Sequence, residues 1–415
     1  MSVKKAVITG AGVLTPFGYG VDTLMRGLSE ERCATRYMDE WESYSGLNSR
    51  VAAPVSIEGE RQISRRYRRT MSPMSIYAAQ AADMALDQAG LGEGTVANNP
   101  DVGCIVGHTT GSPKTLHAAY RELVENGDFG MFGSSDFFKC ISHSASLNLA
   151  QYLGITGTVM ATSAACASGL QAVGTALAMV RDGRQKVVVC GGAEELHVTV
   201  TGSFDILFAT SDGFNDCPSK TPRPFDRDRD GLVCGEGAGI VVVEEKEHAL
   251  KRGADVLAEI SGYNTCGNGA HVSRSNPGSM EQCMRAALDD GGIKADEVDY
   301  INAHATGTAQ GDAAEAEAIG RVFPDHPAPV SSLKGNIGHT LGASGPIELV
   351  ASLQMMRTGI LYPTHNLGDV AEDCQGVNLL RESVQKEISC ILKNSFAFGG
   401  INAAMVCRRG RENDE

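Results

Sequence analysis

The strongest constraint on the fold is a repeated alternation of short apolar runs with segments of helical periodicity. Apolar runs at residues 102–106, 186–190 and 239–244 have the length and composition of buried strands. The pattern restarts near Gly253 with a further run at residues 256–260, and no low-complexity linker separates the two parts. Buried strands that alternate with helices predict an α/β fold, built on a mainly parallel sheet that helices cover.

Composition excludes several classes of function. The chain has 415 residues and a net charge of −14, which argues against nucleic acid as a partner. No signal sequence is visible and no apolar run approaches the length that spans a membrane. The 12 cysteines lack the paired CxxC spacing of zinc sites. We therefore expect a soluble, cytoplasmic protein that binds no metal, nucleic acid or membrane.

A glycine-rich turn near the N-terminus superficially resembles a dinucleotide-binding loop. It follows the apolar run at residues 5–10 and contains Gly10 and Gly12. However, Thr15 stands at the third glycine position, and Pro16 would interrupt the helix that must follow. We therefore do not expect a nicotinamide cofactor.

The clearest candidate nucleophile is Cys166, within residues 158–170. This segment is typical of an apolar strand, a tight turn of small residues and a helix that ends near Gly183. Free amide hydrogens and the helix dipole at a helix N-terminus favour a thiolate. On this segment alone the alternative is a structural cysteine, since free cysteines are among the most buried residue types.

Two histidines in the second half of the chain favour the catalytic interpretation. His304 ends an apolar run at residues 298–303, and His339 follows a second run after Lys334. Strand ends are where α/β folds place their chemistry. A third run leads into a glycine-rich turn at residues 394–400, whose backbone amides could donate to an oxyanion.

A dense positive segment interrupts this acidic chain at residues 61–69. A run of charge is usually a solvated surface, but five arginines in nine residues are not typical of one. The segment contains Arg61, Arg65, Arg66, Arg68 and Arg69.

Jointly, these motifs resemble a β-ketoacyl-acyl carrier protein synthase of the elongating kind, in the thiolase superfamily. The likeness runs through VITGAG, SAACASG, PFDRDRDG, HATGTAQGD, LKGNIGHTLGASG and NSFAFGG, over nearly the full length. It implies a five-layer αβαβα fold of two similar halves. Residues 1–253 would carry Cys166, and residues 254–412 would carry His304, Lys334 and His339.

The resemblance also implies a role for each matching residue. Cys166, His304 and His339 would form the catalytic triad, with Lys334 paired to Glu315. The backbone amides of Cys166 and Phe398 would form the oxyanion hole, and Phe398 would gate the site. The remaining implied roles are orientation of the malonyl and pantetheine groups by Thr306 and Thr308, the acyl pocket at Thr110, and carrier docking by the arginine segment. Ala305 and Ala397 stand where the family more often has glycine, and Ala397 is expected to stiffen the gating loop.

The implied reaction is a decarboxylative Claisen condensation. An acyl group on Cys166 would react with malonyl-acyl carrier protein to give 3-oxoacyl-acyl carrier protein. No cofactor is implied, because phosphopantetheine arrives on the acyl carrier protein. The implied assembly is a homodimer, or a heterodimer with a chain-length factor. Fatty-acid elongation and a type II polyketide or polyene pathway both remain open, although Thr110 is smaller and more polar than the isoleucine common at its position.

Three related classes are the alternatives. A thiolase would need a second cysteine where this chain has Phe398, and initiating synthases use a histidine and an asparagine. A non-catalytic chain-length factor would lack Cys166. The residues present favour the condensing enzyme over all three.

Overall fold

The computed structural model describes residues 3–56, 59, 62–128, 132–269 and 274–410. Ten strands of the main sheet follow the order β11-β10-β14-β15-β9-β1-β8-β7-β5-β6. The N-terminal five are β1 (Ala6–Thr15), β5 (Val102–Gly107), β6 (Val159–Thr162), β7 (Val187–Glu194) and β8 (Gly237–Glu245). The C-terminal five are β9 (Ala258–Gly267), β10 (Tyr300–Asn302), β11 (Val330–Ser331), β14 (Cys390–Phe396) and β15 (Ile401–Arg408).

The two sets of strands repeat one topology. In the first set, β8 pairs antiparallel with β1 and β7, and β5 pairs parallel with β7 and β6. In the second set, β15 pairs antiparallel with β9 and β14, and β10 pairs parallel with β14 and β11. The sets join where Val7 and Ile8 of β1 pair with Glu259 and Ala258 of β9.

The expectation of a mainly parallel sheet is therefore wrong, because the sheet is mixed. Its central strands run antiparallel, yet β1, β7 and β8 are buried along their whole length. Continuous apolar character shows that helices cover both faces of a strand, and here it does not report the direction of the neighbouring strand.

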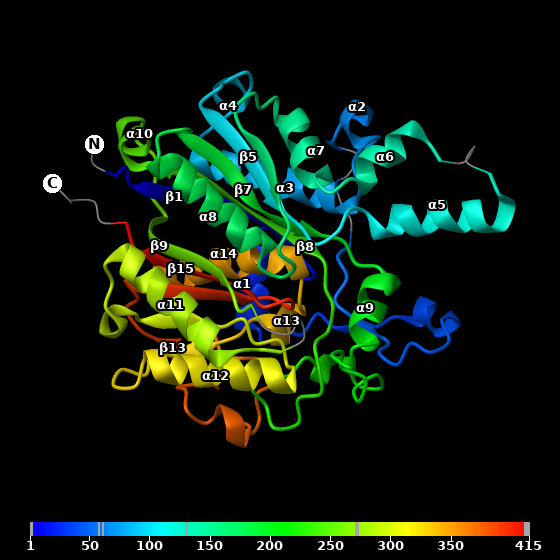
Figure 1. The fold of residues 1–415 in the computed structure, drawn as a ribbon. Coiled ribbons are helices and arrows are strands. Elements are labelled where there is room, and N and C mark those ends of the chain that lie inside the picture. Colours follow the sequence, from blue (N-terminus) through cyan, green and yellow to red (C-terminus); the bar gives the residue numbers. More distant parts are fainter. Residues whose placement is uncertain (1–2, 57–58, 60–61, 129–131, 270–273, 411–415) are drawn as a thin grey trace.

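Helices fill three layers around these strands (Figure 1). The outer face of the N-terminal half packs against α3 (Pro73–Ala89) and α7 (Ser144–Leu153), and that of the C-terminal half carries α11 (Pro277–Gly291) and α12 (Ala309–Val322). Between the halves, α8 (Ser168–Arg181) and α14 (Ser344–Thr358) contact strands of both, which gives a five-layer αβαβα arrangement. The other helices and strands are α1 (Val21–Ser29), α2 (Arg65–Arg68), α4 (Glu93–Val96), α5 (Pro113–Asn126), α6 (Ser134–Cys140), α9 (Val198–Asp205), α10 (Lys246–Lys251), α13 (Lys334–Ile337), β2 (Gly18–Tyr19), β3 (Arg36–Tyr37), β4 (Val51–Ala52), β12 (Ile360–Leu361) and β13 (Val384–Gln385).

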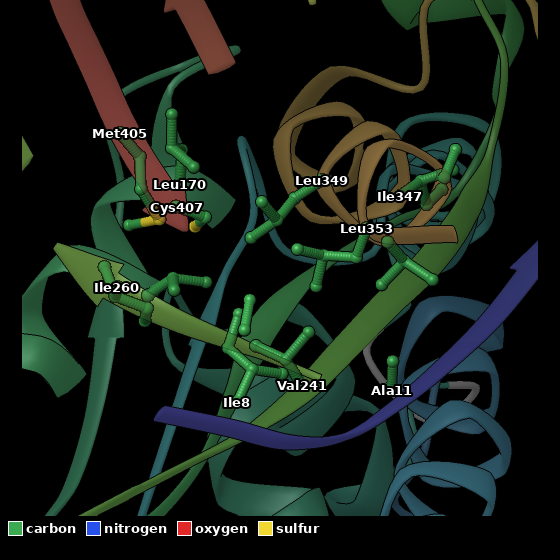
Figure 2. Packing of buried hydrophobic residues seen from close by; sticks show 14 of the residues in the cluster. Ile8, Ala11, Leu170, Val241, Ile260, Ile347, Leu349, Leu353, Met405 and Cys407 are labelled. Carbon is green, nitrogen blue, oxygen red and sulfur yellow. The ribbon is translucent and has the colours of Figure 1, made fainter. Parts of the chain in front are cut away.

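The largest hydrophobic cluster lies in the middle layer. Figure 2 shows side chains of α14 packing between strands that come from both halves. Because both halves bury apolar surface on the same two helices, the middle layer holds them together. The residues labelled there are Ile8, Ala11, Leu170, Val241, Ile260, Ile347, Leu349, Leu353, Met405 and Cys407.

The glycines near the N-terminus serve strand–helix packing. Strand β1 continues to Thr15 instead of ending in a loop at Gly10. A Cβ on Gly10 would lie 2.0 Å from the carbonyl oxygen of Ala85 in α3, and one on Gly12 equally close to that of Ala81. The pattern that resembles a nucleotide loop therefore lets helix α3 approach β1 closely.

Two helices, α5 and α6, lie at residues 113–126 and 134–140. Helix α5 buries none of its residues, and Tyr120 and Val124 are exposed. It extends away from the body of the molecule (Figure 1). It packs against the neighbouring helix α6, and none of its residues reaches the core. Across the described part of the chain, no helix combines the length and apolar character needed to cross a lipid bilayer.

Replacing Gly10 with alanine tests the packing role. The new Cβ would collide with the backbone of α3, which cannot move without displacing the helix. Overpacking of this kind costs about 1–3 kcal/mol, so the free energy of unfolding in urea should fall by that amount or more. Gly92→Ala is the matched control, because nothing lies within 4 Å of its Cβ position. Equal stability of the two variants would contradict the assignment.

Candidate active site

Cys166 lies in a tight turn between β6 and the first turn of α8. Ala165, just before it, has φ of 47°, which is unusual for a residue other than glycine. The hydroxyl of Ser168 fixes this turn, because it accepts from the amide of Ala164 at 2.8 Å and donates to the carbonyl of Ala165 at 2.6 Å. Cys166 is 2% exposed, and it comes from the N-terminal half of the fold.

His339 reaches Cys166 from the other half. Its Nε2 lies 2.9 Å from Sγ of Cys166, and its Nδ1 lies 2.9 Å from the hydroxyl of Ser344. That hydroxyl is 3.0 Å from Thr340 Oγ1, and either oxygen can be the donor. Ser344 can therefore accept from or donate to Nδ1, so Nε2 of His339 can act as acceptor or as donor.

His304 completes the group from the end of β10. Its ring meets that of His339 edge-on, with centroids 5.2 Å apart. One ligand atom from each of Cys166, His304 and His339 lies within 4.8 Å of the others. Nδ1 of His304 is buried and has no hydrogen-bond partner within the described residues. The structure thus brings Cys166 together with two predicted histidines that lie more than 130 positions later in the sequence.

Both imidazoles are held in the neutral state. Burial lowers the pKa of His304 and of His339 well below 6.5, and the charge of nearby Lys334 lowers each pKa further. Lys393 acts in the same direction on both rings. A neutral imidazole can donate from one nitrogen while it accepts at the other.

The expectation of a resting thiolate at the helix terminus is not met. Burial raises the pKa of Cys166 to about 12. Lys334 and the backbone N–H groups of Phe398 and of Cys166 itself oppose this rise without cancelling it. Desolvation of the charged sulfur outweighs the helix terminus, so the proton of Cys166 must be taken by a base when the sulfur reacts.

The predicted pairing of Lys334 with Glu315 is wrong. Nζ of Lys334 lies 2.6 Å from Oε1 of Glu348 on α14, and both side chains are fully buried. The second oxygen of Glu348 lies 2.6 Å from Nζ of Lys393 on β14. One carboxylate therefore pairs with two ammonium groups.

Glu315 instead holds the loop that follows His304. Its carboxylate accepts from the amides of His304 at 2.8 Å and Ala305 at 2.7 Å, and from the side chain of Asn394 at 3.1 Å. Asp312, one turn earlier on α12, accepts from the amide of Thr306 at 2.9 Å. The sequence does not predict these backbone donors to Glu315 and Asp312, because the contacts depend on how the loop folds back over α12.

A cavity of about 360 Å³ reaches the two histidines. Its lining includes His304, His339, Thr306, Thr308 and Phe398. The hydroxyls of the two threonines lie 3.1 Å apart. Phe398 also directs its backbone N–H at the sulfur of Cys166, so this residue connects the cavity wall to the nucleophile. Its ring packs edge-on against Phe204, with centroids 5.6 Å apart.

The other predicted site residues lie elsewhere. Thr110 is exposed in the single chain and does not line this cavity. Arg61 is outside the described residues. Arg65, Arg66 and Arg69 are exposed on and beside the short helix α2, and Arg68 is half-buried.

Glu348, Lys393 and Ser344 were missed in the sequence. Glu348 stands in the apolar run IELVASL, and Lys393 in the apolar run ILKNSF. A charged residue inside a run that must be buried needs a buried partner, and that signal could have identified both.

The same triad is, among the described residues, the one group of three potential metal ligands. A cysteine and two histidines are donors that suit zinc. Two ammonium groups beside a single shared carboxylate disfavour a divalent cation there. The arrangement fits a buried sulfur nucleophile with two neutral imidazoles.

Comparison with known proteins places this site in a family. The model described as "Beta-ketoacyl synthase, N-terminal domain" matches residues 4–249, and "Beta-ketoacyl synthase, C-terminal domain" matches residues 257–368. The chain is 36% identical over 409 residues to 3-oxoacyl-[acyl-carrier-protein] synthase 1 of Escherichia coli (strain K12), covering 98% of this chain and 99% of that protein.

Similar solved structures belong to the same family. A β-ketoacyl synthase from Burkholderia phymatum has a TM-score of 0.95 and 38% identity, covering 98% of this chain and 100% of that one. A type II polyketide ketosynthase, solved with its acyl-carrier protein and bound to the hexaketide, has a TM-score of 0.90 and 28% identity over 99% of this chain and 100% of that one. The chain belongs to the β-ketoacyl synthase family, and it is an acyltransferase that performs Claisen condensation in fatty-acid or polyketide elongation.

Proposed function

We propose that Cys166 carries the growing acyl chain while His304 and His339 promote decarboxylation of a malonyl group on an acyl carrier protein. The observation that carries this assignment is the 2.9 Å contact between Sγ of Cys166 and Nε2 of His339, beside the backbone N–H groups of Cys166 and Phe398. The family needs no cofactor of its own, since phosphopantetheine belongs to the carrier.

In the first half-reaction, Nε2 of His339 takes the proton of Cys166 as the sulfur attacks the acyl thioester. The negative oxygen of the tetrahedral intermediate accepts from the amides of Cys166 and Phe398. The intermediate then expels the pantetheine thiolate, which receives the proton from His339. The acyl group is left on Cys166, and the resting protonation of the site is restored.

In the second half-reaction, the malonyl group enters through the cavity past Thr306 and Thr308. Loss of CO₂ leaves an enolate, whose oxygen accepts from the N–H groups of His304 and His339. The enolate carbon attacks the thioester carbonyl on Cys166, and the collapsing intermediate expels the sulfur. Cys166 regains one proton, so each condensation consumes one proton and releases one CO₂.

The Ser344 hydroxyl supports both roles of His339. In the first half-reaction Nδ1–H donates to Ser344 and Nε2 accepts from the thiol. In the second, the hydroxyl of Ser344 donates to Nδ1 and Nε2–H is free to donate. The contact with Thr340 gives Ser344 a second partner in either state.

Several surface features support assembly as a dimer. Strand β6 ends the strand order, and its residues Val159 and Met160 are exposed. Exposed aromatic residues at Phe137 and Phe138 lie on α6. An apolar sheet edge is a surface that another chain can cover. We assign these surfaces to a homodimer or to a chain-length-factor partner, and Thr110 to an acyl pocket closed at that interface.

The remaining assignments concern the two halves and the compartment. A boundary at Gly253, in the turn between α10 and β9, separates the repeated halves at residues 1–253 and 254–412. All 12 cysteines are free, which supports a reducing, cytoplasmic location.

We assign docking of the acidic carrier to the arginine segment around α2. Arg65, Arg66 and Arg69 are exposed and make no ion pair with a described residue. Arg66 lies over the ring of Tyr67, 5.6 Å from its centroid. On a chain of net charge −14, this patch would counter the general repulsion of an acidic partner.

The nucleophile is tested by intact mass after incubation with acyl-carrier protein. The wild-type chain should gain the mass of one acyl group, and Cys166→Ala should gain none while it keeps its fold. Cys190→Ala, another buried cysteine, is the matched control and should still load. Absence of loading in the wild-type chain would favour the non-catalytic chain-length-factor alternative.

The histidines are tested by separating the half-reactions. His304→Ala and His339→Ala should each slow CO₂ release from malonyl carrier by about 100-fold or more, because each removes a donor to the enolate. Some acyl loading of Cys166 should survive, especially in His304→Ala, where the contact between His339 and Cys166 remains. Near-normal CO₂ release in both variants would remove the histidines from this role.

The docking patch is tested by reversing two charges. Arg65→Glu with Arg66→Glu should raise the KM for carrier-bound substrate by about 5- to 10-fold and flatten its dependence on salt. Activity on a small pantetheine thioester should hardly change, because the reacting groups are elsewhere. An equal loss on both substrates would mean that the segment supports the fold.

A further inference from the structure

Lys393 is a buried charge that the proposed chemistry does not use. It lies in the middle of β14, where its backbone pairs with Asn302 of β10 and with Met405 of β15. Its side chain is 0% exposed. Nζ forms an ion pair with Glu348 at 2.6 Å and donates a hydrogen bond to the carbonyl of the adjacent Asn394.

Neutralising Glu348 does not require Lys393. Lys334 already forms a hydrogen-bonded ion pair with the other oxygen of Glu348 at 2.6 Å. Burial of an ammonium group costs several kcal/mol, so a second one on the same carboxylate must be matched by other interactions. Burial lowers the pKa of Lys393 to about 8, with Glu348 opposing the shift, so the group remains an ammonium at neutral pH.

The charged and titratable groups that interact with Lys393 come from several different elements. Glu348 lies on α14, Lys334 on α13 and Glu315 on α12, and Tyr300 of β10 faces Glu348. Glu315 is the second carboxylate of the group, and Lys393 favours its charged form against the effect of burial. The two lysines and two glutamates together carry no net charge when all are ionised.

Loss of the Lys393 charge would leave this group with a net charge of −1 beside both imidazoles. Lys393 lowers the pKa of His304 and of His339, as Lys334 does. A net negative charge would instead stabilise an imidazolium. An imidazolium at His339 cannot accept the proton of Cys166, and two such charges would replace the neutral donors of the proposed mechanism.

We propose that Lys393 is a positioning residue: its ammonium holds one oxygen of Glu348 while Lys334 holds the other, and the two ammonium groups keep both imidazoles neutral during decarboxylation. This inference rests on the proposed roles of His304 and His339. Lys393 touches no reacting atom, and it acts on the reaction through Glu348, Lys334 and the field at the two rings.

The test is the pH profile of CO₂ release from malonyl carrier in Lys393→Met and Lys393→Gln. Neutral histidines are the active form, so activity is lost as the pH falls through their pKa. Removing the cation raises that pKa, so the acid limb should move to higher pH by about one unit, a tenfold loss at a fixed pH on that limb. Lys393→Gln keeps a donor for Glu348 and should shift the limb as Lys393→Met does, whereas Lys393→Arg keeps the charge and the wild-type limb.

The matched control is Lys186→Met. This change removes an ion pair of similar length, the 2.7 Å contact between Lys186 and Asp101, which lies at the surface just before β7. Its acid limb should not move. A uniform loss of rate at every pH in the Lys393 variants would make Lys393 a structural support, and so would failure of both neutral variants to fold; either result overturns the proposal. Absence of CO₂ release in the wild-type chain would instead overturn the proposed function, so the two failures are distinguishable.

Discussion

The chemistry of this site depends on one buried carboxylate, that of Glu348, which binds two ammonium groups. It lies on α14, the helix that packs against both halves of the sheet. Through Lys334 it is connected to the segment that carries His339, and through Lys393 to the strand that leads to Phe398. One ammonium group would be enough to neutralise the charge of the Glu348 carboxylate. Two partners place two ammonium groups near the imidazoles, and both cations add to burial in keeping the rings uncharged.

Close approach of the two halves is the second requirement. Cys166 comes from the N-terminal half, and both histidines come from the C-terminal half. A Cβ on Gly169 of α8 would lie 2.3 Å from the carbonyl oxygen of Gly342, and one on Gly192 of β7 would lie 2.1 Å from it. These glycines allow the loop after His339 to approach the nucleophile turn, so the 2.9 Å contact between Cys166 and His339 depends on missing side chains as much as on present ones.

Much of the fold and the triad could be predicted from the sequence. Apolar runs located the strands, and the glycine-rich loops after them located Cys166, His304 and His339, because strand ends in α/β folds gather chemistry. Strand direction could not be predicted, since antiparallel strands covered on both faces are as apolar as parallel ones. The partner of Lys334 was missed because the pairing with Glu315 was taken from the family resemblance, whereas the structure places Glu348 of α14 against Lys334. The sequence also did not predict that Cys166 stays protonated at rest. Burial raises the pKa of Cys166, and the depth of burial is a property of the packed structure.

The central claim is that the site holds two neutral imidazoles beside a protonated thiol. It is tested most directly by nitrogen NMR of the histidine rings in the resting enzyme, with His304→Gln and His339→Gln used to assign the signals. The account predicts that both rings stay neutral from pH 8 to about pH 6, because their pKa values lie well below 6.5. A ring that titrates near pH 6.5, or an imidazolium at His339 paired with a thiolate at Cys166 at neutral pH, would contradict it.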